Sequence, residues 1–397
     1  MARYYSRKPN PTYAVYRLIA FGILVGISSQ VFLIISWSTP SSSSDEKDPL
    51  LVEKRFGRNV SISRNNGTKS TTSQSESKQK LFVRRQQNPT SRIVKAVDEP
   101  SIVLVSLIFG EYAANKKTLQ MFVKSAETSG VDVILFGDPI PSFPLPAVNV
   151  RHVPCSWNAF VDRVSQRLFD GKEPGTLRKA TYYKIIDFKP LFAFLFPEHV
   201  QSYDWWGHVD NDLILGNVRQ FLTSDMLSQY DIVSPISHRN VFGPFTVYRN
   251  SNIVNEVFRW TKLPLSTIFG TTKTTNFDEW GMMNSHKNLK LNHNSTMDGI
   301  LDEHAPRLGI RIKQSSGIIS WDGVCTSDKK RCEECVFRRG ELTTKRGKER
   351  LLCHYQIGKA FLEESLQNTT TMNKLLAKGE FRVSYPEGFS PVTKRRQ

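Results

Sequence analysis

The sequence lacks the two glycine motifs that most directly reveal a nucleotide-binding fold. Neither G-x-G-x-x-G nor G-x-x-x-x-G-K-[ST] follows the first strand-like run of the folded region, so an ordinary dinucleotide-binding fold and a P-loop are both disfavoured. Acidic residues are scarce as well, with 37 Asp and Glu against 54 Lys and Arg, and the net charge is +17. No nucleic-acid-binding motif accompanies that charge, so we expect no nucleic-acid partner.

Only one run is both long and free of charge, residues 18–37, which read LIAFGILVGISSQVFLIISW. About 20 apolar residues in a helix are enough to cross the hydrocarbon layer of a membrane. A cleaved signal peptide is the alternative, but its apolar core is usually shorter and ends at an Ala-x-Ala cleavage site, which is missing here. We therefore predict an uncleaved transmembrane signal anchor at residues 18–37.

The charges beside this segment predict its orientation. Basic residues precede it and acidic residues follow it, and because Lys and Arg stay on the cytosolic side, residues 1–17 form a cytosolic tail and the rest of the chain is lumenal. Glycosylation sequons agree, since all four follow the span, at Asn59, Asn66, Asn294 and Asn368. We expect a single-pass type II protein of the Golgi or ER membrane.

Residues 38–98 are rich in Ser, Thr, Asn, Gln, Lys and Arg and show no apolar periodicity. Such a segment cannot bury enough apolar surface to offset the entropy lost on ordering, so we predict a disordered stem. The catalytic domain is then expected at residues 99–385, followed by a basic tail at residues 386–397.

Cysteine is rare, with five in 397 residues. Four of them, Cys325, Cys332, Cys335 and Cys353, lie near one another in the sequence, whereas Cys155 stands apart. Clustered cysteines in an oxidising lumen usually form disulfides, so we favour two disulfides. A structural zinc site is the alternative, because the C-x-x-C spacing also suits zinc, and the pairing stays open.

Short apolar runs alternate with helical patterns at the start of the folded domain. Residues 101–109, 131–136 and 147–153 read as strands, and residues 112–128 and 160–168 carry apolar residues at helical spacing. This alternation predicts an α/β fold with a mainly parallel sheet and helices on both faces. Ligands of such sheets bind beyond the carboxyl ends of the strands.

The strongest functional signal lies at residues 203–216, which read YDWWGHVDNDLILG. An aromatic, strand-like run ends there at Asp210 and Asp212. Two carboxylates at a strand end can hold a divalent ion, which neutralises the diphosphate that leaves when a nucleotide sugar reacts. Hard oxygen ligands suit Mn²⁺ or Mg²⁺. The alternative is a solvated acidic turn.

Two motifs here resemble those of a known family. Residues 183–190 read YKIIDFKP and residues 206–212 read WGHVDND. The chain is similar to glycosyltransferases of the GT-A fold, and more narrowly to a glycosyltransferase-like family of microbes with Y-K-x-x-D-F-K-P and W-G-x-x-D-x-D motifs. The resemblance implies a Rossmann-like GT-A domain in which Asp210 contacts the donor ribose and the metal, and Asp212 ligates the metal.

Lys184, Asp187 and Lys189 belong to the first of these motifs. Lys184 and Asp187 are three residues apart and can share one face of a helix. The resemblance implies that a lysine of this set pairs with the donor diphosphate and that Asp187 bonds to the nucleoside, so we include all three among the donor-binding residues. An ion pair on the surface is the alternative.

Asp278 and Glu279 precede a tryptophan and a glycine, a combination that suits sugar binding. An inverting glycosyltransferase needs a general base to deprotonate the acceptor hydroxyl, and either acid can serve. In a retaining enzyme the same group would position the donor sugar. The alternative is an exposed acidic turn.

His354 follows an apolar run near the end of the domain. Several retaining GT-A families end in H-x-x-G-x-x-K, in which the histidine is the third metal ligand and the lysine meets the diphosphate. The resemblance thus implies a metal site of Asp210, Asp212 and His354 with Lys359 at the diphosphate, and it favours a retaining hexosyltransferase. Gly358 and Lys359 each depart from that spacing by one residue. A structural histidine is the alternative.

The sequence therefore predicts a metal-dependent glycosyltransferase that moves a sugar from a nucleotide sugar to a glycan, glycoprotein or polysaccharide acceptor. Two other functions are the alternatives: a non-catalytic sugar-binding or scaffold protein on the same fold, and a nucleotide-dependent phosphotransferase that uses the same pair of carboxylates. The intact set of Asp210, Asp212 and His354 favours the enzyme over the binding protein.

Overall fold

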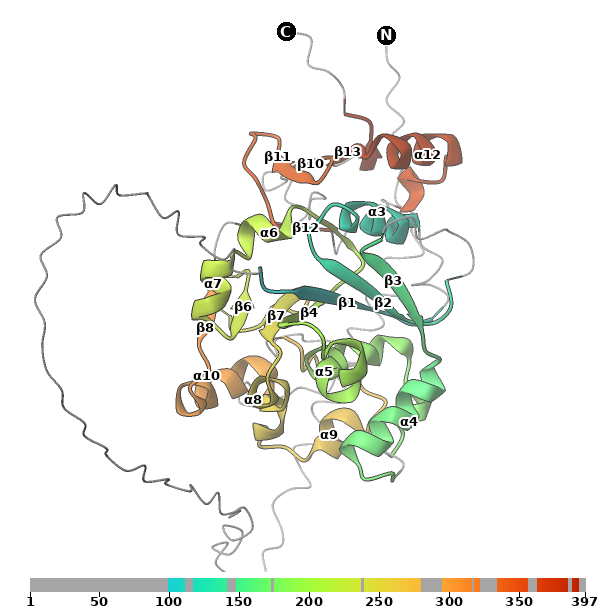
Figure 1. Ribbon diagram of the computed structural model, residues 1–397. Helices are drawn as coiled ribbons and strands as arrows, with labels where there is room; N and C mark the ends of the chain where they lie inside the picture. The colour runs from blue at the N-terminus through green and yellow to red at the C-terminus, as the bar shows by residue number, and fades with distance from the viewer. Residues whose placement is uncertain are drawn as a thin grey trace, which may run out of the picture. The chain divides into compact units, whose positions relative to one another are not determined.

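The computed structural model describes residues 99–110, 117–140, 148–172, 175–236, 239–279, 295–315, 318–321, 334–355, 363–384 and 388–392 (Figure 1). All of them belong to one unit of the chain, Ser91–Gln397. The predicted cytosolic tail, signal anchor and stem, residues 1–98, lie outside the described residues. In the described part of the chain, no helix combines the length and the apolar character that a membrane span requires.

The central sheet contains seven strands within the described residues. Their spatial order is β3 (Val150–Pro154), β2 (Asp132–Gly137), β1 (Ile102–Ile108), β4 (Trp205–Val209), β7 (Phe245–Arg249), β6 (Ile232–Ser234) and β8 (Ile312–Gln314). Strand β7 runs antiparallel to its neighbours β4 and β6, and the other neighbouring pairs are parallel. The prediction of a mainly parallel α/β sheet is therefore confirmed.

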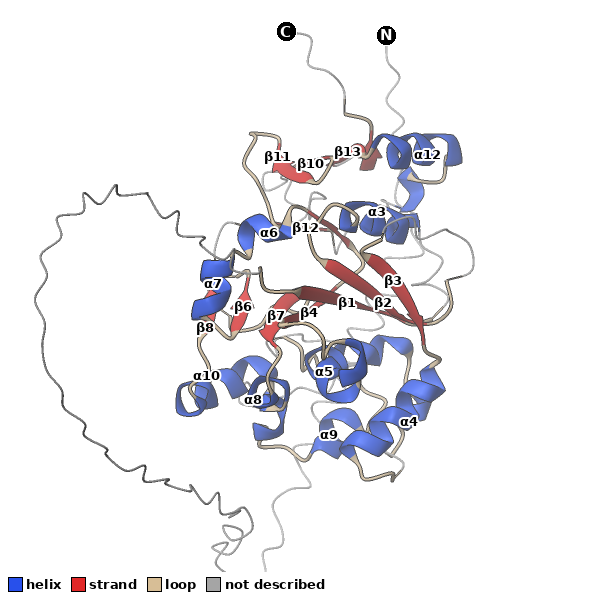
Figure 2. Ribbon diagram, in the orientation of Figure 1, coloured by secondary structure: helices blue, strands red, loops and turns tan. Residues whose placement is uncertain are grey.

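Helices cover both faces of this sheet (Figure 2). One face packs against α3 (Lys117–Ala126), α6 (Val218–Phe221) and α7 (Ser224–Gln229). The other packs against α4 (Trp157–Leu168), α5 (Phe192–Leu195), α8 (Asn252–Asn255), α9 (Leu265–Phe269) and α10 (Met297–Leu308). Within the described residues, three 3-10 segments also belong to this second core, η2 (Leu177–Lys179), η3 (Tyr182–Leu191) and η5 (Val257–Trp260). A fourth, η4 (Pro197–His199), contacts it through the ring of His199, which lies against Phe136.

Alternating side chains of β1 supply both cores. Val103 and Val105 belong to the core on the α4 and α5 face, and Ile102 and Leu104 belong to the core on the α3 face, because successive side chains of a strand project to opposite faces. All four are at most 2 % exposed. A strand that is buried on both faces must be apolar throughout. It therefore appears in the sequence as a continuous apolar run, from which β1 could be predicted.

Two smaller sheets accompany the central one. A three-stranded sheet has the order β5 (Leu213–Leu215), β12 (Leu352–His354) and β9 (Ile319–Trp321). A four-stranded sheet has the order β11 (Glu341–Thr344), β10 (Cys335–Arg338), β13 (Glu380–Ser384) and β14 (Gly388–Ser390), with α12 (Thr369–Lys378) beside it. Strand β14 lies past residue 385, where the sequence analysis ended the domain, and its Phe389 is buried. The folded part therefore continues into the predicted basic tail.

A disulfide joins Cys335 of β10 to Cys353 of β12, with Cα atoms 6.6 Å apart. It links the two smaller sheets, and both cysteines are fully buried. The prediction of a disulfide among the clustered cysteines is confirmed for this pair, whereas Cys325 and Cys332 lie outside the described residues. Cys155 is a free thiol.

Removing this disulfide should destabilise the domain. The two cysteines are 18 residues apart in the sequence, and a cross-link that closes a loop of this length stabilises a fold by about 3 kcal/mol, chiefly by restricting the unfolded chain. We expect the double substitution Cys335→Ala, Cys353→Ala to lower the free energy of unfolding in urea by that amount. Cys155→Ala should change it little, and an unchanged midpoint in the double variant would contradict this role.

Candidate metal centre at the carboxyl edge of the sheet

Asp210 and Asp212 follow directly on β4, at the carboxyl edge of the central sheet. Antiparallel pairing of β5 with β12 places His354 opposite Leu213, and His354 Nε2 lies 3.5 Å from Asp212 Oδ1. One ligand atom from each of Asp210, Asp212 and His354 lies within 4.8 Å of the others. The three residues that the sequence analysis grouped as metal ligands therefore meet at one point.

This set of atoms fits a divalent cation. Two carboxylates and one imidazole nitrogen are ordinary donors for Mn²⁺, whereas Mg²⁺ favours oxygen ligands. Asp212 and His354 are buried, and the Asp210 side chain is 27 % exposed. The site is thus enclosed on the side of Asp212 and His354 and reachable from solvent on the side of Asp210.

The ammonium group of Lys189 joins the metal centre to a second acidic segment. Lys189 Nζ lies 2.6 Å from Asp210 Oδ1 and 3.0 Å from Asp278 Oδ2, and it donates to the Gly243 carbonyl at 3.1 Å. Burial alone would lower the pKa of Lys189, but the carboxylates of Asp210 and Asp278 outweigh it and hold that pKa above its ordinary value. Lys189 is therefore a permanent cation that orients Asp210.

Asp278 and Glu279 lie next to this lysine. Burial raises the pKa of Asp278 to about 8, although Lys189 acts in the opposite direction, and burial also raises the pKa of Glu279. A Cβ on Gly243 would fall 2.4 Å from Cγ and Oε1 of Glu279, so glycine at position 243 is what lets the Glu279 side chain approach. These acids are buried or half-buried, which rules out the alternative of an exposed acidic turn.

Lys184 and Asp187 form an ion pair that is completely buried. Lys184 Nζ lies 2.7 Å from Asp187 Oδ2 and also donates to the carbonyls of Ile268 and Lys273. The Asp187 carboxylate accepts the N–H of Thr275 at 2.9 Å.

Asp187 also accepts the N–H of Phe277 at 3.0 Å, one residue before Asp278. The pair thus fixes the segment that carries the second acidic group. A direct contact of Lys184 or Asp187 with a donor stays a prediction, and it would require this segment to open because neither side chain is exposed.

The chain matches a known protein family over most of its folded part. Residues 104–383 match the model of a family of unknown function, DUF6625. The chain belongs to this family. The match runs from β1 to β13 and includes every residue of the candidate centre. No curated protein matches the chain.

Similar solved structures include two glycosyltransferases. One is mouse xyloside xylosyltransferase 1 in its apo form, with 10 % sequence identity and a TM-score of 0.36 over 66 % of this chain and 99 % of that one. The other is a glycosyltransferase involved in the glycosylation of the major capsid of PBCV-1, with 11 % identity and a TM-score of 0.33 over 68 % of this chain and 99 % of that one.

Sequence reasoning missed the part of Gly243 and the link from Lys189 to Asp278. Lys189 and Asp278 lie on separate segments, η3 and the loop after α9, and no spacing in the sequence relates them. Gly243 stands at the start of an apolar run, but that position fits a plain core strand equally well. Lys359, predicted at the diphosphate, lies outside the described residues.

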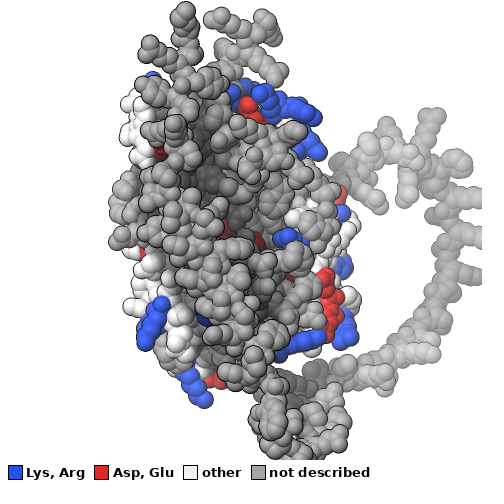
Figure 3. Space-filling model, turned by 180° about the vertical axis from the view of Figure 1, so that it is seen from behind, with Lys and Arg blue, Asp and Glu red and all other residues white. Residues whose placement is uncertain are grey.

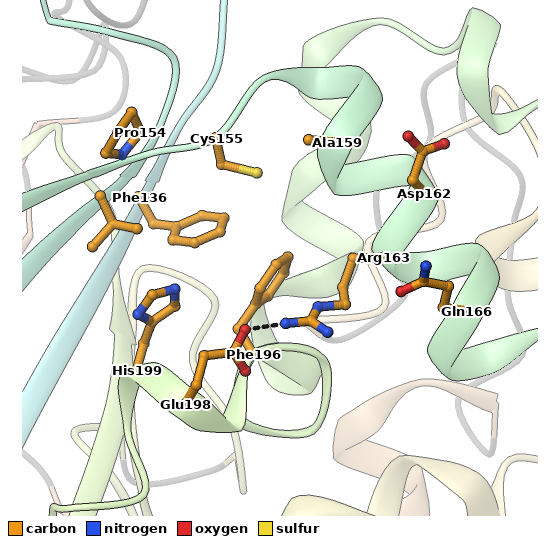
Figure 4. Close-up of a pocket in the computed structure, with 11 residues that line it drawn as sticks. Phe136, Pro154, Cys155, Ala159, Asp162, Arg163, Gln166, Phe196, Glu198 and His199 are labelled. Carbon is orange, nitrogen blue, oxygen red and sulfur yellow. Dashed lines mark hydrogen bonds and ion pairs between the residues drawn. The ribbon is translucent and has the colours of Figure 1, made fainter.

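A pocket of about 380 Å³ lies away from the metal centre, between the end of β3, helix α4 and η4 (Figure 4). Phe136 and Phe196 line its floor, and Arg163 and Glu198 form an ion pair across it. Cys155 also lines it, and burial raises the pKa of this thiol to about 11, so the thiol stays protonated at neutral pH. None of the residues of the metal centre lines this pocket.

Charged side chains of both signs occupy the surface seen from behind (Figure 3). The described Lys and Arg side chains lie near the margins of that face, and Asp and Glu side chains lie close to several of them. In the described part of this face, the basic excess of the chain is therefore not gathered into one stripe.

Removing Lys184 should destabilise the domain strongly. The substitution Lys184→Met leaves the buried Asp187 carboxylate without its counter-charge, a change that typically costs about 3–5 kcal/mol. Lys124→Met is the matched control, since Lys124 forms a pair with Glu127 at the same spacing and at 2.7 Å, but near the surface, where such pairs contribute at most about 1 kcal/mol. Urea unfolding of both variants measures the difference, and equal losses would contradict the structural role of the buried pair.

Proposed function

We propose that this protein is a metal-dependent glycosyltransferase of the GT-A type that transfers a sugar from a nucleotide-sugar donor to a glycan, glycoprotein or polysaccharide acceptor. The observation that carries the proposal is the convergence of Asp210, Asp212 and His354 within 4.8 Å. They meet at the carboxyl edge of a mainly parallel sheet, where α/β proteins bind their ligands.

The metal would be held by Asp210, Asp212 and His354. Bound there, a divalent cation such as Mn²⁺ supplies Lewis-acid neutralisation of the charge that grows on a departing nucleoside diphosphate. Asp210 is the most exposed of the three, so a donor that enters from solvent would meet it first, and Lys189 holds its carboxylate in place.

Asp278 and Glu279 would act on the sugar part of the donor or on the acceptor. Asp278 contacts Lys189, which also contacts Asp210 of the metal centre, and Glu279 lies against Gly243. A hexose attached to the diphosphate would therefore lie beside these two acids. In an inverting reaction one of these acids removes the proton of the acceptor hydroxyl. In a retaining reaction, which the histidine ligand favours, the same acid holds the donor sugar by hydrogen bonds to its hydroxyls.

Asp212→Asn tests the metal mechanism. The substitution keeps the size of the side chain but removes one charge from the ligand set, so it should abolish Mn²⁺-dependent donor binding. Loss of one charge-stabilising element typically costs about 3–4 kcal/mol in the transition state, or roughly a hundred- to a thousandfold in rate. The melting temperature of the metal-free protein should stay the same or rise, because two adjacent carboxylates repel each other.

The measurement is the release of nucleoside diphosphate from a panel of nucleotide sugars with Mn²⁺, together with thermal unfolding. Asp225→Asn is the control, since Asp225 is exposed on α7 and takes no part in the centre. Full activity of the wild type in excess chelator, or an active Asp212→Asn variant, would remove the metal mechanism. Cleavage of the donor between its two phosphates, which gives nucleoside monophosphate and sugar 1-phosphate and no nucleoside diphosphate, would favour the phosphotransferase.

We further propose that the protein is anchored through residues 18–37 in the Golgi or ER membrane with the catalytic domain in the lumen. The support is the charge distribution around that segment and the position of the sequons after it. Asn368, the one sequon asparagine among the described residues, is exposed at the start of α12.

Its Oδ1 accepts the Thr371 N–H at 3.0 Å, which leaves Nδ2 available to a glycan. We therefore expect glycosidase treatment of the protein from eukaryotic cells to increase its mobility on a gel. Asn368→Asp, which keeps the helix cap, should remove one glycan. A domain that is unglycosylated and open to protease in sealed microsomes would overturn this topology.

A further inference from the structure

Tyr182 is an exposed aromatic residue at the same edge of the sheet as the metal centre. Its relative exposure is 49 %, and its ring lies against Gly110, two residues past the end of β1. A Cβ on Gly110 would fall 2.6 Å from Tyr182 Cδ2, and the φ of Gly110 is +81°. Both the contact and the left-handed backbone therefore require glycine at position 110.

The ring of Tyr182 is held from behind. Trp157 at the start of α4 meets it edge-on, with centroids 6.0 Å apart and planes at 83°, and Trp157 stacks in turn on Phe160 at 5.6 Å. The Gly110 N–H donates to Asp138 Oδ2, directly after β2. The ring is thus fixed by the core on one side and exposed on the other, so a planar ligand can stack on it with little ordering cost.

We propose that Tyr182 is the platform on which the base of the nucleotide-sugar donor stacks. The inference rests on the proposed function and adds to it a residue that recognises the nucleoside. An aromatic side chain stacks on any of the bases, since each base has a π-face.

The order of the strands explains why the base, and not the sugar, would lie there. Strand β4, which leads to Asp210, stands between β1 and β7. Tyr182 covers the end of β1, whereas Glu279 contacts Gly243, just before β7. If the diphosphate lies at the end of β4, the base and the sugar extend from it in opposite directions along this edge of the sheet, one toward β1 and the other toward β7.

The β7 side offers carboxylates, which suit sugar hydroxyls, and the β1 side offers an aromatic face, which suits a base. Neighbouring strands are about 5 Å apart, so a nucleotide diphosphate is long enough to reach from the metal centre to the platform.

The test is calorimetric titration of the full-length protein in detergent with UDP and with GDP, each with Mn²⁺. Inorganic pyrophosphate with Mn²⁺ is the ligand that lacks a base. We expect Tyr182→Ala to weaken the tighter-binding nucleotide roughly five- to a hundredfold and to leave pyrophosphate binding unchanged. Tyr182→Phe should bind like the wild type, because it keeps the ring.

Trp260→Ala is the matched control. Trp260 is also an aromatic residue with 49 % exposure, but it belongs to η5 and contacts His304, so its loss should leave both affinities unchanged. Thermal unfolding monitors the fold of each variant. If Tyr182→Ala fails to fold, Tyr182→Leu takes its place, since leucine keeps apolar bulk without a planar ring.

Equal nucleotide affinity in the wild type and in Tyr182→Ala would overturn the platform and leave the proposed function standing. A loss of pyrophosphate binding in the same variant would also overturn it, because the ring would then support the metal centre and not the base. A wild type that binds neither UDP nor GDP with Mn²⁺ would refute the proposed function and this inference together.

Discussion

The ammonium group of Lys189 connects the parts on which the candidate site depends. It lies on η3, contacts Asp210 after β4, Asp278 after α9 and the carbonyl of Gly243 before β7. A buried cation must be compensated by nearby negative charge, since its desolvation is otherwise costly. That requirement brings the segment of Asp278 close to the end of β4, where Asp210 lies, while the pairing of β5 with β12 places His354.

Two neighbouring lysines of one short segment thus have different environments. Lys184 is enclosed by Asp187 and by backbone carbonyls, and it holds the segment that leads to Asp278. Lys189 contacts the partly exposed carboxylate of Asp210 and the buried Asp278. The buried pair of Lys184 and Asp187 makes this segment rigid. Lys189, on the same segment, therefore holds a fixed position beside Asp210, which would bind the metal. A catalytic constellation needs this kind of support, because its groups must be held to within about half an ångström.

The residues proposed to bind the metal, the sugar and the base lie at the ends of three different strands, along one edge of the sheet. Strand β4 leads directly to the candidate metal ligands. Gly243, which lies beside Glu279, comes shortly before β7, and Gly110, which lies beside the ring of Tyr182, comes two residues after β1. In both places a side chain from another segment comes so close that a Cβ would collide with it. Glycine at these positions therefore belongs to the site and not only to the turns.

The sequence by itself determined the fold class and the three residues that meet in the candidate metal centre. Continuous apolar runs show buried parallel strands because both of their faces need apolar side chains, and Asp210 and Asp212 stand out because they interrupt such a run at its end. Only the tertiary structure decided that the local pair of Lys184 and Asp187 is buried and that Lys189 contacts Asp278, since burial and the second contact depend on distant segments. The physical reason is that the sequence does not distinguish a charged residue that faces water from one that is paired with a buried partner. The difference between them is burial, which only folding creates.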